Sequence, residues 1–290
     1  MKTQNRIANQ NFKNTLDLFL GIKSDEVQHS TFQKYQTWKK TLLEYEGSLP
    51  GFFWTEETLN CKHLLGYEEF LKYIKHLKPN TVSKYNKCFI TFLSEMYPKV
   101  DTSCLAISQV ARKPVSITED ELEHLIHLSL KKSDAEVRDI FVMLCLTGME
   151  YKDFLAYNWQ NISDVIEYNT NRRNRKAIVP LDKRMLPIID RYNGQFTKYS
   201  EPYLNRKLKA IFRANGYNRL VSEHTDKEPY APLHDKITLG IGRHTFIQHV
   251  INNRATLWDI MHMTGVHDIE KLSRYDYPKF DYATFSLIKP

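Results

Sequence analysis

The sequence lacks the long apolar runs that cross membranes. No segment approaches the roughly 18 consecutive apolar residues that a spanning helix needs. The N-terminus, MKTQNRIANQNFKNTLDLFL, also lacks an apolar stretch long enough for a secretory signal. Both absences favour a cytoplasmic protein that makes no membrane contact.

Cysteine is scarce, and its spacing excludes the common zinc motifs. The four cysteines, Cys61, Cys88, Cys104 and Cys145, form no CxxC pair and have apolar neighbours. We therefore expect reduced, mostly buried thiols, as is usual in the cytosol. His262 and His267 flank a turn and could pair on a metal, but no third ligand is evident, so we expect no metal site and no cofactor.

The chain does contain an excess of basic residues and many aromatic ones. Its 290 residues have a net charge of +7 and a pI near 9.0, with 17 tyrosines and 15 phenylalanines. Hydrophobic residues make up 42%, which is enough for a sizeable core. A basic, aromatic-rich protein favours a polyanionic partner, nucleic acid first. A solvated basic surface is the alternative, and charge alone does not decide between the two.

The first part of the chain has the pattern of a small helical bundle. Residues 1–30 are polar and only weakly periodic, which is typical of an arm. Apolar side chains spaced three and four apart predict helices over 31–46 and 64–78, and a third helix capped by Asn80. Their aromatic stripes are interpreted as core. We expect residues 1–108 to form an arm and a helical domain.

A second domain is predicted over residues 117–290, after a linker at 109–116. Two capping boxes are predicted, Thr118 with Glu121 and Ser133 with Glu136, and Gly148 would end the helix that follows. Two short strands, 165–168 and 176–180, predict a hairpin. The remaining pattern is helical, at about 184–192, 202–214, 243–252, 256–263 and 268–275. The expected fold class is mainly α with one small antiparallel sheet.

Three segments then follow one another in the order and spacing of a known family. They are LCLTGMEYKDFLAYNWQNI at 144–162, KAIVPL at 176–181 and the stretch from ITLGIGRHTF to Tyr275. Together they resemble the tyrosine recombinase, or phage integrase, family over roughly residues 112–280. The segment NTVSKYNKCFITFLSEM also resembles the core-binding domain of that family. The resemblance implies the tyrosine recombinase fold, with a helical DNA-binding domain before the catalytic-type one.

The resemblance also implies a chemistry that needs no metal. A tyrosine oxygen attacks a DNA phosphate and forms a 3′ phosphotyrosine, while arginine forks neutralise the charge on phosphorus. By position, Tyr275 is the nucleophile, Arg243 is the second phosphate-binding arginine, and Asp153 is the acidic residue that holds the site together. The hairpin lysine that protonates the leaving oxygen aligns with Arg172, and arginine is a poor general acid.

Three further positions depart from the family pattern. Glu150 stands where the first arginine is expected, and a carboxylate there repels a phosphate. Gly240 and Val266 stand where the two histidines are expected. The hairpin arginines or His267 would have to compensate for these losses, with Lys176 as another candidate proton donor. We therefore expect a degenerate site with impaired catalysis. The resemblance alone leaves open whether Tyr275 still reacts, and the histidine after Arg243 is interpreted as structural.

Contact with double-stranded DNA is the firmer expectation. Basic runs at the hairpin, the linker and residues 202–222 suit phosphate contacts, although plain solvation is the alternative. The predicted function is that of a DNA-binding accessory or regulatory protein in the integration or recombination of a mobile element. Its partner would be a competent recombinase or a second copy on DNA; the alternative is an active site-specific recombinase. The candidate DNA contacts are Arg112, Lys113, Arg172, Arg173, Arg175, Lys176, Arg206, Lys207 and Lys209.

Overall fold

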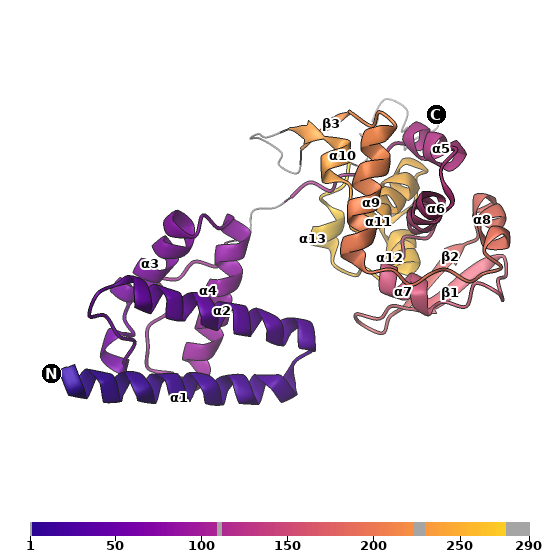
Figure 1. The fold of residues 1–290 in the computed structure, drawn as a ribbon. Helices are drawn as coiled ribbons and strands as arrows, with labels where there is room; N and C mark the ends of the chain where they lie inside the picture. Colours follow the sequence, from indigo (N-terminus) through magenta and orange to yellow (C-terminus); the bar gives the residue numbers. More distant parts are fainter. Residues whose placement is uncertain (1, 109–111, 223–229, 277–290) are drawn as a thin grey trace, which may run out of the picture. The chain divides into compact units, whose positions relative to one another are not determined.

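The computed structural model describes residues 2–108, 112–222 and 230–276, and the chain divides into two compact units (Figure 1). The units are Met1–Val110 and Ala111–Pro290. Part of the predicted linker, residues 109–111, lies outside the described residues. No helix of the described segments is both long and apolar enough to span a bilayer.

The first unit is helical. It contains α1 (Lys2–Glu26), α2 (His29–Ser48), the 3₁₀ helix η1 (Glu56–Thr58), α3 (Cys61–Glu69), the π-helical turn η2 (Phe70–Ile74) and α4 (Pro79–Met96). The predicted N-terminal arm is wrong, because α1 is a helix of 25 residues. Its buried Phe12, Leu16 and Phe19 lie at helical spacing. Long polar stretches between the apolar residues make this periodicity weak in the sequence.

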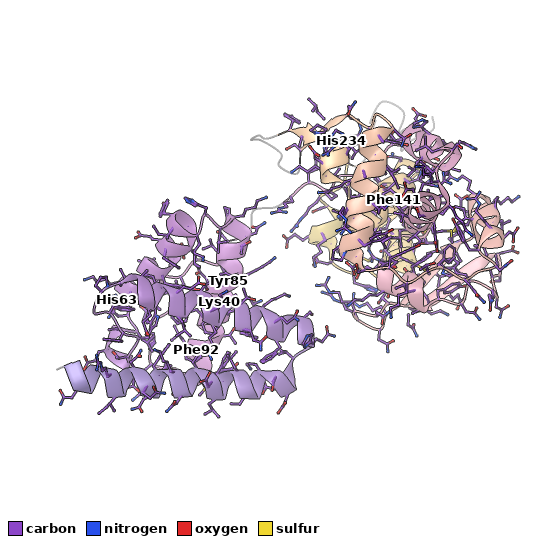
Figure 2. The ribbon with its side chains drawn as sticks, viewed as in Figure 1. Lys40, His63, Tyr85, Phe92, Phe141 and His234 are labelled. Carbon is purple, nitrogen blue, oxygen red and sulfur yellow. A yellow bond between two sulfur atoms is a disulfide. The ribbon has the colours of Figure 1, made fainter. Side chains whose placement is uncertain are left out.

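The core of this unit is aromatic, as the stripes predicted. Phe92, which Figure 2 shows among the helices, meets Phe12 edge to face at 5.7 Å between ring centroids. A buried carboxylate links α1, α2 and the loop that follows: Glu46 accepts hydrogen bonds from Asn9 Nδ2 at 2.6 Å and from the Trp54 amide at 3.0 Å. Ring packing of this kind contributes beyond the area buried.

Two local expectations in the first unit are corrected. The helix expected over 64–78 ends at Ile74, and α4 begins at Pro79 with Lys78 as its N-cap. Proline suits the first turn because the amide that it lacks would have no intrahelical partner there, so Asn80 is not the cap. The expectation of reduced thiols is also wrong for one pair. Cys61 and Cys104 form a disulfide with Cα atoms 5.8 Å apart, whereas Cys88 and Cys145 are thiols.

The second unit is built around α6 (Lys132–Thr147), whose residues from Val137 onwards are all buried. Figure 2 places Phe141 of this helix among the other elements of the unit. Helix α6 packs against α5, α9 and α11. The other elements are α5 (Glu119–His127), α7 (Tyr151–Ala156), β1 (Val165–Asn169), β2 (Lys176–Pro180), η3 (Lys183–Met185), α8 (Leu186–Arg191), α9 (Glu201–Ala214), β3 (Leu220–Val221), β4 (Ala231–Pro232), α10 (Leu233–Lys236), α11 (Leu239–Asn252), α12 (Leu257–Thr264) and α13 (Ile269–Leu272).

The predicted hairpin is confirmed. Strands β1 and β2 pair antiparallel, from Val165 opposite Pro180 to Asn169 opposite Lys176. The described residues also contain a second antiparallel pair, β3 with β4, that the sequence did not reveal. Each of these strands has two residues, which is too short for an alternating pattern to be read.

Helix ends in the second unit follow local chemistry in one case and tertiary contacts in another. The capping box at Thr118 and Glu121 is confirmed, with Thr118 N donating to Glu121 Oε2 at 2.9 Å. The box expected at Ser133 is wrong, because α6 begins at Lys132. The carboxylate of Glu136 instead accepts from the Thr197 amide and the Tyr199 hydroxyl, both at 2.8 Å. Glu136 therefore binds residues 61 and 63 positions further along the chain in place of the N-terminus of its own helix.

Close packing between α6 and α11 depends on a glycine. A Cβ at Gly242 would lie 2.8 Å from Cβ of Leu144 and 3.3 Å from its carbonyl carbon. At Gly240, on the same helix, the nearest atom to a Cβ would be 3.8 Å away. Only the first glycine is therefore required for the close approach of the two helices.

Gly242→Ala is expected to lower the free energy of unfolding of the full chain by about 1 to 3 kcal/mol, as overpacking usually does. Gly240→Ala is the matched control and should change it by no more than about 1 kcal/mol, in the stabilising direction, because alanine is the better helix former. Urea unfolding followed by circular dichroism measures both. Equal stability of the two variants would contradict the close contact.

Candidate functional site

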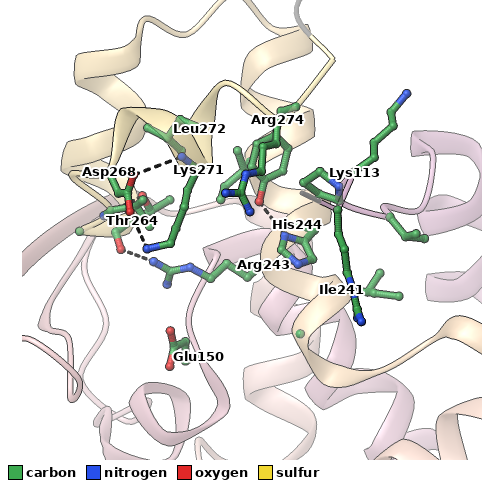
Figure 3. Close-up of a pocket in the computed structure, with 18 of the residues that line it drawn as sticks. Lys113, Glu150, Ile241, Arg243, His244, Thr264, Asp268, Lys271, Leu272 and Arg274 are labelled. Atoms are coloured by element: carbon green, nitrogen blue, oxygen red, sulfur yellow. Dashed lines mark hydrogen bonds and ion pairs between the residues drawn. The ribbon is translucent and has the colours of Figure 1, made fainter. Parts of the chain in front are cut away.

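The side chain of Arg243, on α11, joins the ends of two other helices. Its Nη1 donates to the carbonyl of Gly148 at 2.8 Å, and its Nη2 donates to the carbonyl of Thr264 at 2.5 Å. Gly148 caps α6 and Thr264 is the last residue of α12, so both carbonyls belong to helix ends that lack intrahelical donors. Two of the five guanidinium N–H groups are used in this way. Figure 3 shows Arg243 with its contact to Thr264.

Both helix ends have the backbone that this contact requires. Gly148 and Gly265 are in the left-handed region, with φ of 66° and 64°, and each terminates its helix as a C-cap. Glycine adopts this conformation without the steric cost that a Cβ brings. The prediction that Gly148 ends its helix is confirmed. The caps turn both chains away and leave the carbonyls accessible to the arginine fork.

Tyr275 lies directly beside the next residue of α11. Its hydroxyl and Nδ1 of His244 are 2.6 Å apart, and the tyrosine side chain is buried. The following residue, Asp276, is fastened to the same helix: Gln248 accepts from its amide at 3.1 Å and donates to its carbonyl at 2.7 Å. Lys113 pairs with the Asp276 carboxylate at 2.7 Å. The position of the Tyr275 hydroxyl is therefore set by α11 and by the segment that precedes α5.

The imidazole of His244 is held in its neutral form. Burial lowers its pKa below the usual value, and the positive charge of the neighbouring Arg243 lowers that pKa further. A neutral imidazole has one ring nitrogen with a hydrogen and one without. The Nδ1 atom can therefore accept the hydrogen bond of the Tyr275 hydroxyl at neutral pH.

Arg243, His244 and Tyr275 line one cavity of about 500 Å³. The charged residues of its wall are strongly unbalanced, with eight basic side chains and two carboxylates. Six of the basic residues come from the segment before α5, from the hairpin turn or from the region of α13. The basic residues are Arg112, Lys113, Arg172, Arg173, Lys236, Arg243, Lys271 and Arg274, and the acidic ones are Glu150 and Asp268.

The three positions that depart from the family pattern line the same cavity. Glu150 is the exposed N-cap residue of α7, and Figure 3 shows it on the cavity wall near Arg243. Gly240 is exposed, and a Cβ there would meet only Thr238 Oγ1, at 3.8 Å. Val266 is half-buried and offers no polar atom. The cavity thus brings Glu150, Gly240 and Val266 together with Arg243 and Tyr275.

The hairpin turn is tied to α7 by a buried carboxylate. Asp153 Oδ1 accepts a hydrogen bond from the amide of Asn171 at 2.7 Å, and the aspartate is only 4% exposed. This contact fixes the start of the turn that carries Arg172 and Arg173, both of which line the cavity. Asp153 therefore positions the basic turn and does not itself face the cavity.

The structure brings only some of the predicted site residues together. Tyr275, Arg243, Arg172, Arg173, Arg112 and Lys113 line the cavity. The remaining predicted residues lie outside its wall. Two of them form ion pairs, Lys176 with Glu167 and Lys207 with Asp134, while Arg206 lies over the Tyr203 ring. His267 is exposed, Lys209 is half-buried on α9, and Arg175 buries an Nη1 atom with no hydrogen-bond partner in the described segments.

Sequence reasoning missed several residues of the wall. Lys236 comes from α10. Lys271 and Arg274 come from the region of α13: Lys271 precedes Tyr275 by about one helical turn, and Arg274 is the residue directly before it. Lys271 pairs with Asp268 at 2.6 Å, which offsets one of the two carboxylates. The helical spacing of Lys271 and Tyr275 was a signal that could have found this residue. No linear pattern indicated Lys236 or the role of His244.

Arg243→Lys is expected to lower the free energy of unfolding by about 1.5 to 3 kcal/mol, because an ammonium group cannot serve both carbonyls as the fork does. The exposed Arg206→Lys is the matched control and should change it by less than about 0.5 kcal/mol. Urea unfolding of the two variants and the unmodified chain measures the difference. If Arg243→Lys is as stable as the control, the two contacts do not hold the helix ends.

A search of models of known protein families finds no match. A curated protein of Caldanaerobacter subterraneus subsp. tengcongensis, named "Putative tyrosine recombinase TTE1313", is 22% identical over 161 residues, which is 53% of this chain and 54% of that protein. The chain therefore spans about half the length of this curated relative.

Several solved structures have the same fold. A lambda integrase dimer bound to a COC′ core site matches with a TM-score of 0.69 and 14% identity, over 93% of this chain and 80% of the other. XerH recombinase bound to its difH substrate matches with a TM-score of 0.63 and 13% identity, over 87% of this chain and 76% of the other. The Tn1549 transposon integrase with a circular intermediate DNA matches with a TM-score of 0.62 and 13% identity, over 93% of this chain and 96% of the other. The chain has the tyrosine recombinase fold, as the resemblance implied, and about half of it is similar in sequence to a putative tyrosine recombinase.

Proposed function

We propose that this chain binds duplex DNA and that the cavity of its second unit receives a backbone phosphate. The observation that carries the proposal is the wall of eight basic and two acidic side chains around Arg243. Phosphate contacts of this kind supply most of the affinity of DNA-binding proteins and little of their sequence preference. The rigid arginine fork suits a tetrahedral phosphate, because its donors lie in one plane.

The structural neighbours support this choice of ligand. XerH, the Tn1549 integrase and lambda integrase were each solved on DNA. We infer the same class of ligand for this chain from the shared fold and from the charges of its own cavity. The basic residues outside the cavity, Arg175, Lys176, Arg206, Lys207 and Lys209, are proposed as further phosphate contacts.

In this proposal the protein acts in the integration or recombination of a mobile element, as an accessory or regulatory factor. Catalysis is impaired because Glu150 opposes the charge that a reacting phosphate gathers, and because Gly240 and Val266 provide no donor. The partner is a competent recombinase or a second copy of this chain on the same DNA. The helical first unit serves as the core-binding domain.

The double variant Arg172→Ala, Arg173→Ala is expected to weaken binding to every duplex sequence. Each lost phosphate contact should also reduce the slope of log affinity against log salt concentration by about 0.9. The matched control is Lys131→Ala, Lys132→Ala, which removes the same charge from exposed positions outside the cavity wall. Gel shifts at several salt concentrations measure both variants. Unchanged affinity and slope in the hairpin variant would contradict the proposed phosphate site.

A second function is favoured by one observation. The Tyr275 hydroxyl lies at the wall of the cavity that holds the Arg243 fork and contacts an imidazole at 2.6 Å. Both a nucleophile and a phosphate-binding group are therefore present in one site. The second candidate is DNA strand cleavage by Tyr275, in which Arg172, Arg173 or Lys271 supplies charge in place of the missing arginine.

If the second function holds, a nicked duplex that traps the cleaved state should give a covalent protein–DNA adduct. The adduct should disappear in Tyr275→Phe, because the phenol oxygen is the only atom removed. Denaturing gel electrophoresis with a labelled strand measures it. A chain that shifts DNA in gels but forms no adduct on any nicked substrate would be a binder without cleavage activity.

A further inference from the structure

We propose that His244 accepts the proton of the Tyr275 hydroxyl when that oxygen attacks a DNA phosphate. The proposal rests on the second proposed function, strand cleavage. The role is catalytic, whereas the sequence alone favours a structural role for the residue that follows Arg243.

The geometry already has the form of a nucleophile with its base. Nδ1 of His244 and the Tyr275 hydroxyl oxygen are 2.6 Å apart, within the range expected for proton transfer in place. The two rings lie 5.9 Å apart between centroids. Figure 3 shows His244 beside Arg243 at the cavity, with its contact drawn as a dashed line. Because both residues line the same cavity, a phosphate bound there by Arg243 lies on the wall that also carries the base.

The wall of the cavity offers few other acceptors for this proton. Among the described residues of the wall, His244 is the only histidine, since positions 240 and 266 are glycine and valine and His267 lies outside the wall. Of the two carboxylates, Asp268 is paired with Lys271. Glu150 lies on the side of the Arg243 fork, away from the drawn contact of His244 in Figure 3. The imidazole of His244 contacts the Tyr275 hydroxyl directly, with Nδ1 at 2.6 Å from the oxygen.

The step balances without a cofactor. The O–H bond of Tyr275 breaks and its proton moves to Nδ1 of His244, while the phenol oxygen forms a bond to phosphorus. The bond from phosphorus to the 5′ oxygen breaks, and the 5′ oxygen leaves with that electron pair and takes a proton from water. The resulting imidazolium is stabilised by the negative charge on the phosphate oxygens, which Arg243 also contacts.

The surroundings keep the base ready for this step. His244 shares its helix with Arg243, and Arg112, Lys113, Lys271 and Arg274 line the same cavity from two other segments. Burial and the Arg243 charge lower the pKa of His244 below its usual value. A lowered pKa means that the neutral, accepting form persists at neutral pH and is lost only as the pH falls through that lowered value.

The hydrogen bond itself can be tested without activity. In the full chain with ¹⁵N-labelled histidine, we expect Nδ1 of His244 to carry no hydrogen at neutral pH and Nε2 to carry one. Tyr275→Phe should raise the pKa of His244, because it removes a bond that stabilises the neutral ring. A hydrogen on Nδ1 at neutral pH, or an unchanged pKa in Tyr275→Phe, would overturn the proposal.

Adduct formation on a nicked duplex tests the proton transfer. His244→Asn keeps an acceptor oxygen near the position of Nδ1 but cannot hold a proton, and His244→Phe removes both functions. Both variants are expected to form the adduct at least about 100-fold more slowly at neutral pH. Their rates should rise with pH toward the ionisation of Tyr275 itself, whereas the unmodified chain should show a flat profile over that range.

The exposed His262→Asn on α12, outside the cavity wall, is the control and should keep the rate and profile of the unmodified chain. Gel shifts of the same proteins distinguish DNA binding from the proton transfer. Normal DNA binding without any adduct in the unmodified chain overturns the role of His244 and leaves DNA binding intact. An adduct formed by His244→Asn at the unmodified rate and pH profile would show that the histidine only positions the tyrosine.

Discussion

The fork of Arg243 at the ends of α6 and α12 is the contact on which the second unit depends. It supplies donors to two carbonyls that their own helices cannot satisfy. The same contact places a permanent positive charge at the cavity wall, where an anion can reach it. The same side chain therefore stabilises the fold and carries the charge proposed to bind a phosphate. The two carbonyl contacts are by themselves a sufficient reason for an arginine at this position.

The surplus of basic groups around that fork has a second consequence. Among the described residues, eight like charges along one wall repel each other, and they are offset by the two carboxylates of the wall and by Asp276, which pairs with Lys113. An arriving phosphate relieves this repulsion, so the cavity favours an anion more than any single side chain would. Glu150, which lines the same cavity, acts against this tendency. The electrostatic potential at this wall is therefore set by which charged side chains line it.

Local chemistry accounts for the parts of the fold that the sequence predicted well. The box at Thr118, the cap at Gly148 and the paired strands from Val165 to Pro180 all involve neighbours along the chain. The errors arose where a distant contact prevailed. Helix α1 is ordered by aromatic partners in other helices, and Glu136 binds residues 197 and 199 in place of its own helix end.

The sequence by itself determined the helical class, the hairpin and the order of the recombinase-like segments, because these depend on periodicity, caps and motif spacing. It also identified Arg243 and Tyr275 as partners in one site. Only the tertiary structure decided which other charges join them. Lys236 and Lys271 reach the cavity from separate elements, and His244 meets Tyr275 across 31 positions of the chain. Such convergence depends on how helices pack, which a linear pattern of residues does not specify.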